Sequence, residues 1–387
     1  MDFELTDDQR AFRETLRAFV EKEIVPVATE WEHSGRYPTE IVAKMKEMGL
    51  FGLTVPEEYG GLDADMVTFA LVFEEIARGW MGVAGTIGSH SLSAWMIARH
   101  GTEEQKRRYL PDLASGARRT GLALTEPGAG TDLQGIQTRA VRDGEHYVVN
   151  GVKTWITNAR HADPLPVLVK TAITEPAHKG MSVLLVDAGT PGFTVSRDLP
   201  KLGYKGTETC EVALQDVRVP VSALLGGEEG RGMQQVLSGL EIGRVNIAAR
   251  AVGVAQAAYD AALSYSRQRE AFGQPIAEFQ AVQLKLADLA TEIQAARLLT
   301  YWAASQADGG KRVDMEAAMA KYFASEVALK ASLESMRIHG GYGYSQEYVV
   351  ERLYRDAPLM AIGEGTNDVQ RLVIAKALIS GKGKVGW

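Results

Sequence analysis

Glu364 stands between two glycines near the C-terminus, in a setting that suits acid–base chemistry. Gly363 and Gly365 carry no side chains, so a ligand can approach the carboxylate closely. Thr366 is a good N-cap for a following helix, which places the carboxylate near the positive end of that helix. Apolar surroundings raise the pKa of a carboxylate, and a base that works at neutral pH needs such a shift. We therefore expect desolvation by a bound substrate to outweigh the helix dipole at Glu364.

A second candidate site is the glycine-rich stretch Leu122-Ala-Leu-Thr-Glu-Pro-Gly-Ala-Gly-Thr-Asp132, in which a short apolar strand leads into a loop. The unhindered backbone N–H groups of this loop can approach an anionic or carbonyl-rich ligand. It is not a dinucleotide-binding fingerprint, because Gly128 and Gly130 lead into further β-like sequence and not into a helix. Glycine spacing alone favours an ordinary tight turn.

The elements that must position these residues form three successive parts. Residues 1–120 show helical periodicity, and residues 121–228 carry short β-rich runs separated by turns. Residues 229–387 return to long helices rich in Ala and Leu, predicted over residues 233–267 and 277–308. The sequence therefore predicts an α+β chain with an N-terminal all-α domain, a middle β domain and a C-terminal helical bundle.

Local signals place some of the element ends. Thr102 and Gln105 have the spacing of a capping box, which predicts a helix that begins directly after Thr102. The dipeptides Asp143-Gly144 and Asn150-Gly151 lie between β-rich runs and predict two hairpin turns. Both hairpins would belong to an antiparallel sheet.

Composition excludes several classes of protein. The net charge of −7 argues against a general nucleic-acid surface, and no apolar run reaches the length of a membrane span. No N-terminal signal is visible, and the single cysteine, Cys210, excludes an internal disulfide and fits a reducing compartment, so we expect a cytoplasmic protein. The seven histidines show no metal-ligand spacing, so we expect no metal site, and His339 has no partner in a nucleophile pattern.

The chain resembles the acyl-CoA dehydrogenase family over essentially its whole length. The motifs that carry this resemblance are Thr125-Glu-Pro-Gly-Ala-Gly-Thr-Asp132, Trp155-Ile-Thr-Asn158, Arg269-Glu-Ala-Phe-Gly-Gln-Pro-Ile276, Arg337-Ile-His-Gly-Gly-Tyr-Gly-Tyr344 and the segment 355–371 around Glu364. The resemblance implies the family's fold, with a middle antiparallel β domain and a C-terminal four-helix bundle. It also implies FAD as the cofactor.

The first flavin contacts that the resemblance implies lie in the middle domain. Leu122, Leu124 and Thr125 would meet the pyrimidine side of the flavin, and Trp155 and Thr157 would lie near its N5 atom. Two further residues of the glycine-rich stretch, Gly130 and Thr131, would also contact the cofactor. Thr131 matches a position that touches both the flavin and the CoA arm, although a turn hydroxyl that bonds its own backbone is the alternative.

A second group of cofactor contacts is implied in the last third of the chain. Arg269, Phe272 and Gln280 match a segment that reaches the diphosphate and adenosine of FAD from a neighbouring subunit, so the resemblance implies a homo-oligomer, with a tetramer as the family norm. An arginine suits a diphosphate because its fork donates two hydrogen bonds. An exposed arginine in a loop is the alternative.

The fourth motif departs from the family pattern. Arg337 stands where most relatives carry Gln, which replaces an amide by a cation and puts that hydrogen bond in doubt, although a positive charge suits a diphosphate. Gly340 and Gly341 allow close approach of the backbone to the cofactor, with a helix C-cap as the alternative. We expect all three residues to contact FAD.

By resemblance, Glu364 removes the α-proton of an acyl-CoA thioester. Some relatives place this base before the arginine that matches Arg244, but here that position is Gly243, so Glu364 has no rival. Glu241 and Arg244 match positions around the thioester and pantetheine, with a solvated helix-face pair as the alternative. We also expect Gly363 and Gly365 to border the substrate. In the same signature, Thr366 and Asp368 match positions that contact the cofactor.

The implied activity is α,β-dehydrogenation of an acyl-CoA, with an electron-transfer flavoprotein as the acceptor of the electrons. An oxidase or monooxygenase on the same scaffold is the alternative within enzymes, and a non-catalytic CoA-thioester or protein-binding scaffold is the alternative outside them. Gly363 stands where many straight-chain enzymes of the family carry Tyr, which favours a branched, cyclic or aromatic acyl group. Gly82, Gly85 and Gly88 are expected to widen the same pocket, because glycine is costly inside a helix.

Overall fold

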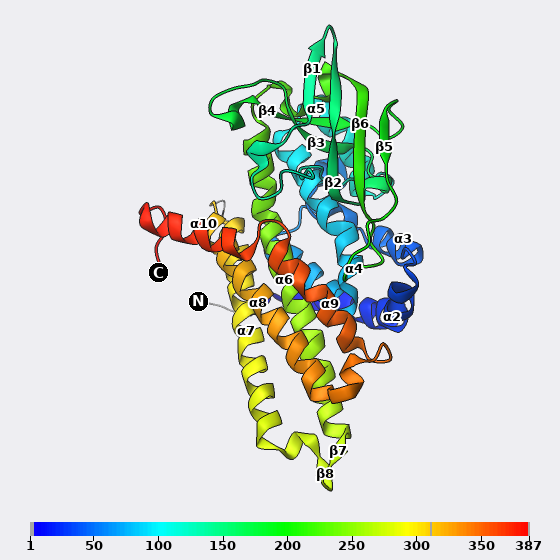
Figure 1. Cartoon of the computed structure of the whole chain (residues 1–387), viewed down its shortest axis with the longest axis vertical. Coiled ribbons are helices and arrows are strands. Elements are labelled where there is room, and N and C mark those ends of the chain that lie inside the picture. The colour runs from blue at the N-terminus through cyan, green and yellow to red at the C-terminus, as the bar shows by residue number, and fades with distance from the viewer. Residues whose placement is uncertain (1–3, 310–311, 386–387) are drawn as a thin grey trace.

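The computed structural model describes residues 4–309 and 312–385, in which a β-sheet lies at one end of a long helical body (Figure 1). The helices that precede the sheet are α1 (Asp7–Phe19), α2 (Val25–Ser34), α3 (Thr39–Glu47), α4 (Met66–His100) and α5 (Glu103–Ala114). A π-helical turn, Val20–Ile24, joins α1 to α2. The predicted capping box at α5 is confirmed, since Thr102 and Gln105 each accept a hydrogen bond from the other residue's backbone.

Helix α4 forms the centre of the N-terminal part. Its backbone is interrupted at Trp80, which has φ −159° and ψ 109°, so the helix consists of two arms that meet at a kink. Its buried residues include Phe69, Phe73 and Ile87, which belong to a core shared with α1, α2 and α3. The second arm of α4 also packs against the β-sheet and α6, so this helix connects all three parts of the chain.

The middle part is a six-stranded sheet with the order β4-β3-β1-β2-β6-β5. Its strands are β1 (Arg139–Asp143), β2 (His146–Thr157), β3 (Leu165–Lys170), β4 (Met181–Val186), β5 (Phe193–Val195) and β6 (Thr209–Pro220). Neighbouring strands are antiparallel except β1 and β3, which pair in parallel at Arg139 and Lys170. The predicted antiparallel sheet therefore includes one parallel junction.

The two predicted hairpin turns have different outcomes. Asp143-Gly144 does form the turn between β1 and β2, with Gly144 at φ +60°. The prediction of a turn at Asn150-Gly151 is wrong, because β2 continues through both residues and only its register with β6 shifts there. Glycine is needed for close packing instead, since a Cβ at position 151 would lie 2.7 Å from the Cα of Thr138. The dipeptide is thus part of a β-bulge.

The C-terminal part is a bundle of long helices, with α10 crossing away from it (Figure 1). Its elements are α6 (Gly232–Gln268), β7 (Glu270–Ala271), β8 (Gln274–Pro275), α7 (Gln280–Asp308), α8 (Asp314–His339), α9 (Val349–Ile362) and α10 (Asn367–Ile379). Helix α7 begins three residues later than predicted, because residues 276–278 form a 3-10 turn. The α+β fold class is confirmed. Across the described ranges, no helix is long and apolar enough to cross a bilayer.

Candidate functional site

Glu364 lies in the short loop between α9 and α10, with its backbone in the left-handed region at φ +54°. Residues other than glycine seldom adopt this conformation, which points to a constrained functional turn. Gly365 follows at φ +89°, and Thr366 caps α10 as predicted by accepting a hydrogen bond from the backbone N–H of Val369. Gln370 donates through Nε2 to the carbonyl oxygen of Glu364 at 3.2 Å. The loop that aims the carboxylate is therefore held by the helix that follows it.

A buried lysine on α8 holds the same loop from the other side. Nζ of Lys321 donates to the carbonyl oxygens of Ala361 and Gly365, at 3.2 and 2.8 Å, and to Oδ1 of Asn367 at 2.9 Å. Burial lowers the pKa of Lys321 to about 8, an effect that the negative charge of Glu364 opposes. Sequence reasoning missed this residue, and its only signal is a lone lysine on the alanine-rich buried face of α8.

The carboxylate itself is partly enclosed. Its Oε2 atom is buried and forms no hydrogen bond with any of the described residues, although the residue as a whole keeps some access to solvent. Burial raises the pKa of Glu364 to about 7, while the positive charges of Arg250, Lys321 and Arg244 act in the opposite direction. The pKa of Glu364 is raised, which is the direction that we expected. We expected a bound substrate to supply the desolvation, whereas burial by the protein alone already raises this pKa.

Gly243 on α6 provides the space that the carboxylate occupies. A Cβ atom at position 243 would overlap Oε2 of Glu364, and it would lie 2.9 Å from Cδ of that residue and 3.0 Å from Cδ2 of Leu92 on α4. Position 243 is thus in direct contact with the candidate base. A side chain here and the observed position of Glu364 exclude one another.

The two predicted substrate residues near Gly243 are held by the start of α8. Arg244 is buried and forms an ion pair with Asp314, with Nη1 and Oδ1 3.3 Å apart. Glu241 accepts a hydrogen bond from the backbone N–H of Val313, and burial raises the pKa of its carboxyl group. The pair is therefore not a solvated helix-face pair.

Glu241 borders a cavity of about 770 Å³ between α4, α6 and the end of α7. Apolar side chains form part of its wall, among them Trp95, Leu237 and Ile242. Its basic side chains, which sequence reasoning missed, are Arg99, His100, His178, Arg231 and Arg312. The excess of positive charge makes this cavity suitable for an anionic ligand.

The predicted flavin residues of the middle part surround a buried ion pair. Lys153 and Glu126 approach to 2.8 Å with almost no exposure, and Lys153 also donates to the carbonyl oxygen of Leu124 at 3.0 Å. Burial alone would raise the pKa of Glu126, but the hydrogen bonds from Lys153, Thr138 and the Gln137 backbone lower it. The glycine-rich stretch is thus fixed to β2. Its first segment is extended and pairs with β3 only through an isolated bridge at Ala123, so the predicted short strand is not a regular one.

The glycine-rich stretch is only partly covered by the rest of the chain. Leu122, Leu124 and Thr125 are partly exposed and Thr131 is exposed. A Cβ at Gly128 would meet no atom within 4 Å, and a Cβ at Gly130 would meet only Cγ2 of Thr125, at 3.7 Å. The backbone of this loop is therefore accessible to a ligand.

Trp155 projects from the second register shift of β2. It has φ +61°, which is rare for a large side chain, and it is 57% exposed. Thr157 lies two residues further, and Asn158 anchors this end of the motif by donating through Nδ2 to the carbonyl oxygen of Thr86 and to Oγ of Ser89, both at 2.9 Å. The motif end is therefore held against α4 at residues 86 and 89, and Leu92, one turn further along this helix, lies beside Gly243, which contacts Glu364.

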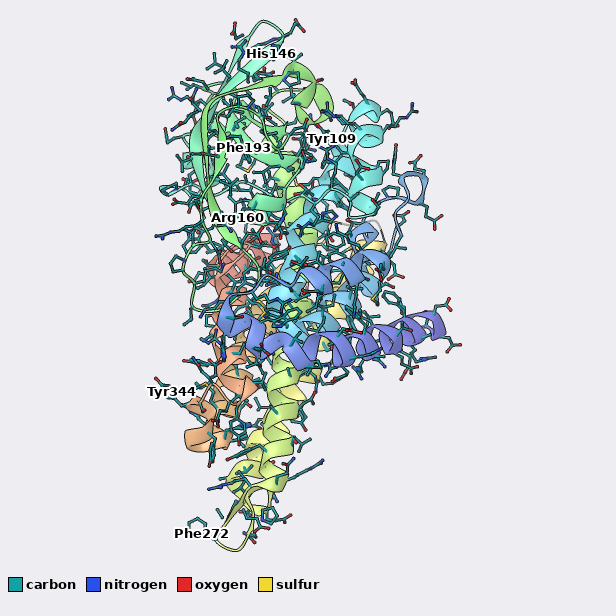
Figure 2. The ribbon with its side chains drawn as sticks, turned by 90° about the vertical axis from the view of Figure 1, so that its right-hand side faces the viewer. Tyr109, His146, Arg160, Phe193, Phe272 and Tyr344 are labelled. Carbon is teal, nitrogen blue, oxygen red and sulfur yellow. The ribbon has the colours of Figure 1, made fainter. Side chains whose placement is uncertain are left out.

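The second group of predicted cofactor residues lies elsewhere in the chain. Arg269 and Phe272 belong to the β7–β8 hairpin, at the opposite end of the molecule from the sheet, and Phe272 is 97% exposed (Figures 1 and 2). Near the base of this hairpin, Arg269, Gly340 and Gly341 border a cavity of about 500 Å³. Gln280 is the exposed first residue of α7. A single chain does not bring this group together with the group around Trp155.

Arg337 and Asp368 are both exposed, and each has a charged partner. Arg337 pairs with Glu334 one turn earlier on α8, a carboxylate that also pairs with Lys285 of α7. Asp368 lies in the first turn of α10, 3.8 Å from Arg371. His339, to which we assigned no role, bonds the carbonyl oxygen of Ser335 and stacks on Tyr265.

The prediction that Gly82, Gly85 and Gly88 widen a pocket is wrong. A Cβ at Gly82 would overlap the carbonyl oxygen of Lys205, and one at Gly85 would overlap the hydroxyl group of Tyr204. A Cβ at Gly88 would lie 2.9 Å from Nδ2 of Asn246. The glycines permit close packing of other groups against α4 and leave no added space.

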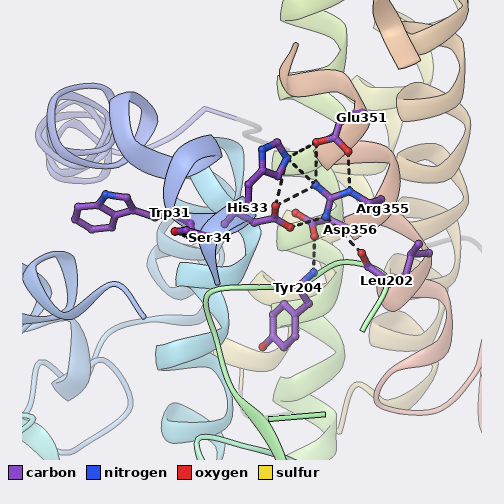
Figure 3. A network of polar contacts seen from close by, with 9 residues as sticks. Trp31, His33, Ser34, Leu202, Tyr204, Glu351, Arg355 and Asp356 are labelled. Atoms are coloured by element: carbon purple, nitrogen blue, oxygen red, sulfur yellow. Dashed lines mark hydrogen bonds and ion pairs between the residues drawn. The ribbon is translucent and has the colours of Figure 1, made fainter. Parts of the chain in front are cut away.

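A polar network holds Tyr204 in this position (Figure 3). The backbone N–H of Tyr204 donates to Oδ1 of Asp356 at 2.6 Å, and burial raises the pKa of Asp356 to about 6. The adjacent Arg355 pairs with the fully buried Glu32 of α2 and with Glu351 of α9, at 2.5 and 2.7 Å. The loop that presses Tyr204 against α4 is thus connected to both α2 and α9.

Comparison with known proteins identifies the same three parts. Profiles described as the N-terminal, middle and C-terminal domains of acyl-CoA dehydrogenase match residues 6–117, 121–217 and 230–379. The chain is 46% identical to a probable acyl-CoA dehydrogenase, YngJ, of Bacillus subtilis, covering 98% of this chain and all of the relative. It is 39% identical to the caffeyl-CoA reductase-Etf complex subunit CarC of Acetobacterium woodii, covering 97% of this chain and 99% of the relative.

A solved structure agrees with this similarity. The structure of butyryl-CoA dehydrogenase from Megasphaera elsdenii superposes with a TM-score of 0.95 at 41% identity, covering 98% of this chain and all of that one. Within the part of the chain that the structure describes, no group of three or more His, Cys, Asp or Glu side chains is arranged to hold a metal ion.

Proposed function

Because the chain belongs to the acyl-CoA dehydrogenase family, we propose that it oxidises the Cα–Cβ bond of an acyl-CoA thioester with Glu364 as the base. The observation that carries this proposal is a buried, unpartnered carboxylate oxygen between two glycines, on a group whose pKa is raised to about 7. Such a group is ionised in part at neutral pH and is basic enough to accept a proton from carbon activated by a thioester.

The cofactor of this family is FAD, and the chain offers residues that fit it. The open backbone at Gly128 and Gly130 and the exposed, backbone-strained Trp155 suit a flat ring with polar edges. Leu122, Leu124, Thr125, Thr131 and Thr157 would complete this contact. When bound, the flavin supplies the acceptor for the hydride that leaves Cβ.

Glu364 would accept the proton that leaves Cα. Its Oε2 atom has no partner to lose, so proton uptake breaks no hydrogen bond of that atom. The left-handed turn, Lys321 and Gln370 would keep the carboxylate in one position during the reaction. Positioning of this kind lowers the entropic part of the barrier.

The CoA arm would occupy the cavity that Glu241 borders. Its phosphates are anionic, and the basic side chains around this cavity, such as Arg99 and Arg231, supply the complementary charge. Glu241 and Arg244 would lie beside the pantetheine and thioester. Thr131, which is exposed, would contact both the flavin and this arm.

For the acyl group we propose a branched, cyclic or aromatic chain. This proposal now rests on Gly363, since a Cβ there would meet only the carbonyl oxygen of Leu359 at 3.2 Å and its Cδ1 atom at 3.8 Å. The name of the relative CarC refers to an aromatic acyl group, which supports the same class. That name also refers to an Etf complex, and we infer that an electron-transfer flavoprotein accepts the electrons from this enzyme as well.

The separation of the two cofactor groups supports a homo-oligomer. The exposed Arg269, Phe272 and Gln280, together with Arg337, Gly340 and Gly341, would contact the diphosphate and adenosine of the FAD held by a neighbouring copy. Thr366 and Asp368 at the start of α10 would add to the cofactor contact. A tetramer would satisfy this arrangement.

Anaerobic mixing of the holoenzyme with a panel of acyl-CoA thioesters tests the proposal. We expect bleaching of the flavin absorbance by at least one branched, cyclic or aromatic thioester, and loss of bleaching in Glu364→Gln. Retained bleaching in that variant would show that another residue is the base. Formation of peroxide in air at the rate of turnover would identify the protein as an oxidase. If the protein contains no flavin even after FAD is added, both redox functions are excluded and a non-catalytic binding scaffold remains.

A further inference from the structure

Arg250 is a buried cation that the mechanism above does not use. It lies on α6 and is 4% exposed. None of the ion pairs formed by the described residues includes it, and its Nε atom has no hydrogen-bond partner. Its closest interactions are weak ones, with Sδ of Met81 at 3.3 Å and with the ring of Tyr204 at 5.0 Å. A buried charge without an acidic partner is costly, so this position needs a compensating group.

Asn246 lies one helical turn before Arg250 and has the same property. It is completely buried, and neither Oδ1 nor Nδ2 forms a hydrogen bond within the described chain. Two adjacent side chains thus present unpaired polar groups on one face of α6. Unpaired polar atoms of this kind are rare in folded proteins and indicate a ligand or ordered water.

The same face of α6 carries the contact with the candidate base. Positions 243, 246 and 250 follow helical spacing, so Asn246 and Arg250 extend from Gly243 along α6 over about 5–10 Å. Glu364 rests on Gly243, and Arg250 is the positive charge that acts most strongly on its pKa. Both polar side chains are therefore close to the place where the acyl carbons must react.

Helix α4 packs closely against these two side chains at a glycine. Gly88 of α4 faces them, with its Cβ position 2.9 Å from Nδ2 of Asn246 and 3.6 Å from Nη1 of Arg250. The guanidinium of Arg250 lies over the ring of Tyr204. The backbone N–H of Tyr204 is held by Asp356 (Figure 3). The arrangement orients Arg250 without neutralising it.

A second buried arginine differs from Arg250 because acidic groups of the chain act on it. Arg352 on α9 is 3% exposed and also has unpaired nitrogen atoms, but it donates to the carbonyl oxygen of Gly79 at 2.9 Å. The negative charges of Asp356, Glu32 and Glu351 act on it. Its charge is thus compensated within the chain, which makes it a matched control for Arg250.

We propose that Arg250 and Asn246 recognise an oxygen acceptor on the acyl group, a carboxylate by preference, beyond the carbons that react. This inference rests on the proposed function, because it assigns a second feature to the substrate of the same site. A carboxylate would pair with the guanidinium through a charge-assisted hydrogen bond and would accept another from Nδ2 of Asn246. It would also supply the negative charge that is lost from the site when Glu364 becomes protonated.

The test compares matched thioesters with and without a terminal carboxylate. Reduction of the holoenzyme flavin is measured with glutaryl-, adipoyl- and pimeloyl-CoA and with pentanoyl-, hexanoyl- and heptanoyl-CoA. We expect kcat/KM for at least one dicarboxylyl thioester to exceed that of its partner by about tenfold or more. Arg250→Gln should reduce this ratio at least tenfold, and Arg250→Lys should keep part of it. Asn246→Asp should also abolish it, because the new carboxylate competes for the guanidinium.

Other outcomes separate this inference from the proposed function. The recognition site is refuted, and the proposed function stands, in either of two cases. In the first, the unsubstituted thioesters reduce the flavin as efficiently as the dicarboxylyl series at every chain length. In the second, Arg250→Gln leaves the ratio of the two kcat/KM values unchanged. If no thioester reduces the flavin, the proposed function fails first. Calorimetric binding to Glu364→Gln then tests recognition without turnover, and equal affinity for both series would refute it.

Two controls exclude a merely structural effect. Arg352→Gln removes an equally buried arginine and should leave the substrate ratio unchanged, whatever it does to thermal stability. Arg250→Gln should also shift the pH profile of both substrate series alike, because its charge lowers the pKa of Glu364. A loss of kcat/KM that is confined to the dicarboxylyl series when each variant is measured at its own pH optimum marks recognition, whereas an equal loss in both series under these conditions would overturn it.

Discussion

Gly243 on α6 and Glu364 in the α9–α10 loop are packed so closely that no side chain fits between them. A Cβ at position 243 would overlap Oε2 of Glu364 and lie 2.9 Å from its Cδ. In the sequence, Gly243 only excludes a second candidate base at that position. It forms part of the site in which the carboxylate of Glu364 rests.

Gly243→Ala should displace the carboxylate. The helix backbone cannot shift easily, so Glu364 must move, and a misplacement of about 1 Å can reduce the rate on the order of a hundredfold. We expect flavin content to be retained and kcat/KM to fall by about this factor. Gly239→Ala, one turn earlier on α6, is the control, because its Cβ would meet the flexible Met96 at 2.8 Å. Equal losses in both variants would argue against a specific effect on the base.

The pH dependence of kcat/KM should show an acidic limb with a midpoint near 7. Burial raises the pKa of Glu364 to about 7, and only the ionised form can accept the α-proton, so activity falls as the pH drops through this value. Steady-state kcat/KM values measured between pH 5 and 9 give the midpoint of this limb. A profile governed only by a group that titrates near pH 4 would contradict the assignment.

Glu364→Gln should stabilise the protein at alkaline pH. In the unfolded chain the carboxyl ionises at about 4.5, whereas in the folded state it ionises at about 7. Ionisation therefore favours the unfolded state as the pH rises above 4.5, and the cost reaches roughly 3 kcal/mol above pH 7. Thermal unfolding at pH 4.5 and pH 8 should show a higher Tm for the variant only at pH 8. The exposed Glu347→Gln should show no such difference.

Lys321→Met should destabilise the fold and move the titration of Glu364 to higher pH. The substitution leaves the carbonyl oxygens of Ala361 and Gly365 and Oδ1 of Asn367 without the donor that now binds them, at a cost of about 3 kcal/mol. Loss of the positive charge should also raise the pKa of Glu364 further, so the acidic limb moves to higher pH. Lys330→Met, which removes an exposed pair with Glu292, should change neither Tm nor this limb.

Gly363→Tyr should restrict the acyl group. Gly363 has φ −66° and ψ 153°, which any residue can adopt, so the substitution adds a wall without backbone strain. We expect kcat/KM for branched, cyclic or aromatic thioesters to fall at least tenfold relative to butyryl-CoA. Gly363→Ala is the control for loss of glycine alone. An unchanged preference in the tyrosine variant would show that position 363 does not border the acyl group.

Some features follow from the sequence because they depend on neighbouring residues. The cap at Thr366, the capping box of Thr102 and the turn at Asp143-Gly144 are all confirmed, since each involves hydrogen bonds or dihedral angles within a few residues. The three-part α+β organisation follows from periodicity in the same way, because period and helix length are local properties.

Other features were decided only by tertiary contacts. Asn150-Gly151 has the local signal of a turn, but pairing of β2 with β6 continues through it, and Thr138 accounts for the glycine. Gly82, Gly85 and Gly88 suggested added space, whereas the loop of residues 202–207 and the Asn246 side chain fill it from segments more than a hundred residues away.

The sequence by itself predicted Glu364 as the candidate base, because the signature that includes it is one continuous segment of neighbouring residues. Only the tertiary structure decided what surrounds that base: Gly243 beside its carboxylate, Lys321 on its loop, and Arg250 with Asn246 on the facing helix. The physical reason is that burial and charge at one carboxylate depend on side chains from several distant helices, and no spacing along the chain reports which of them meet.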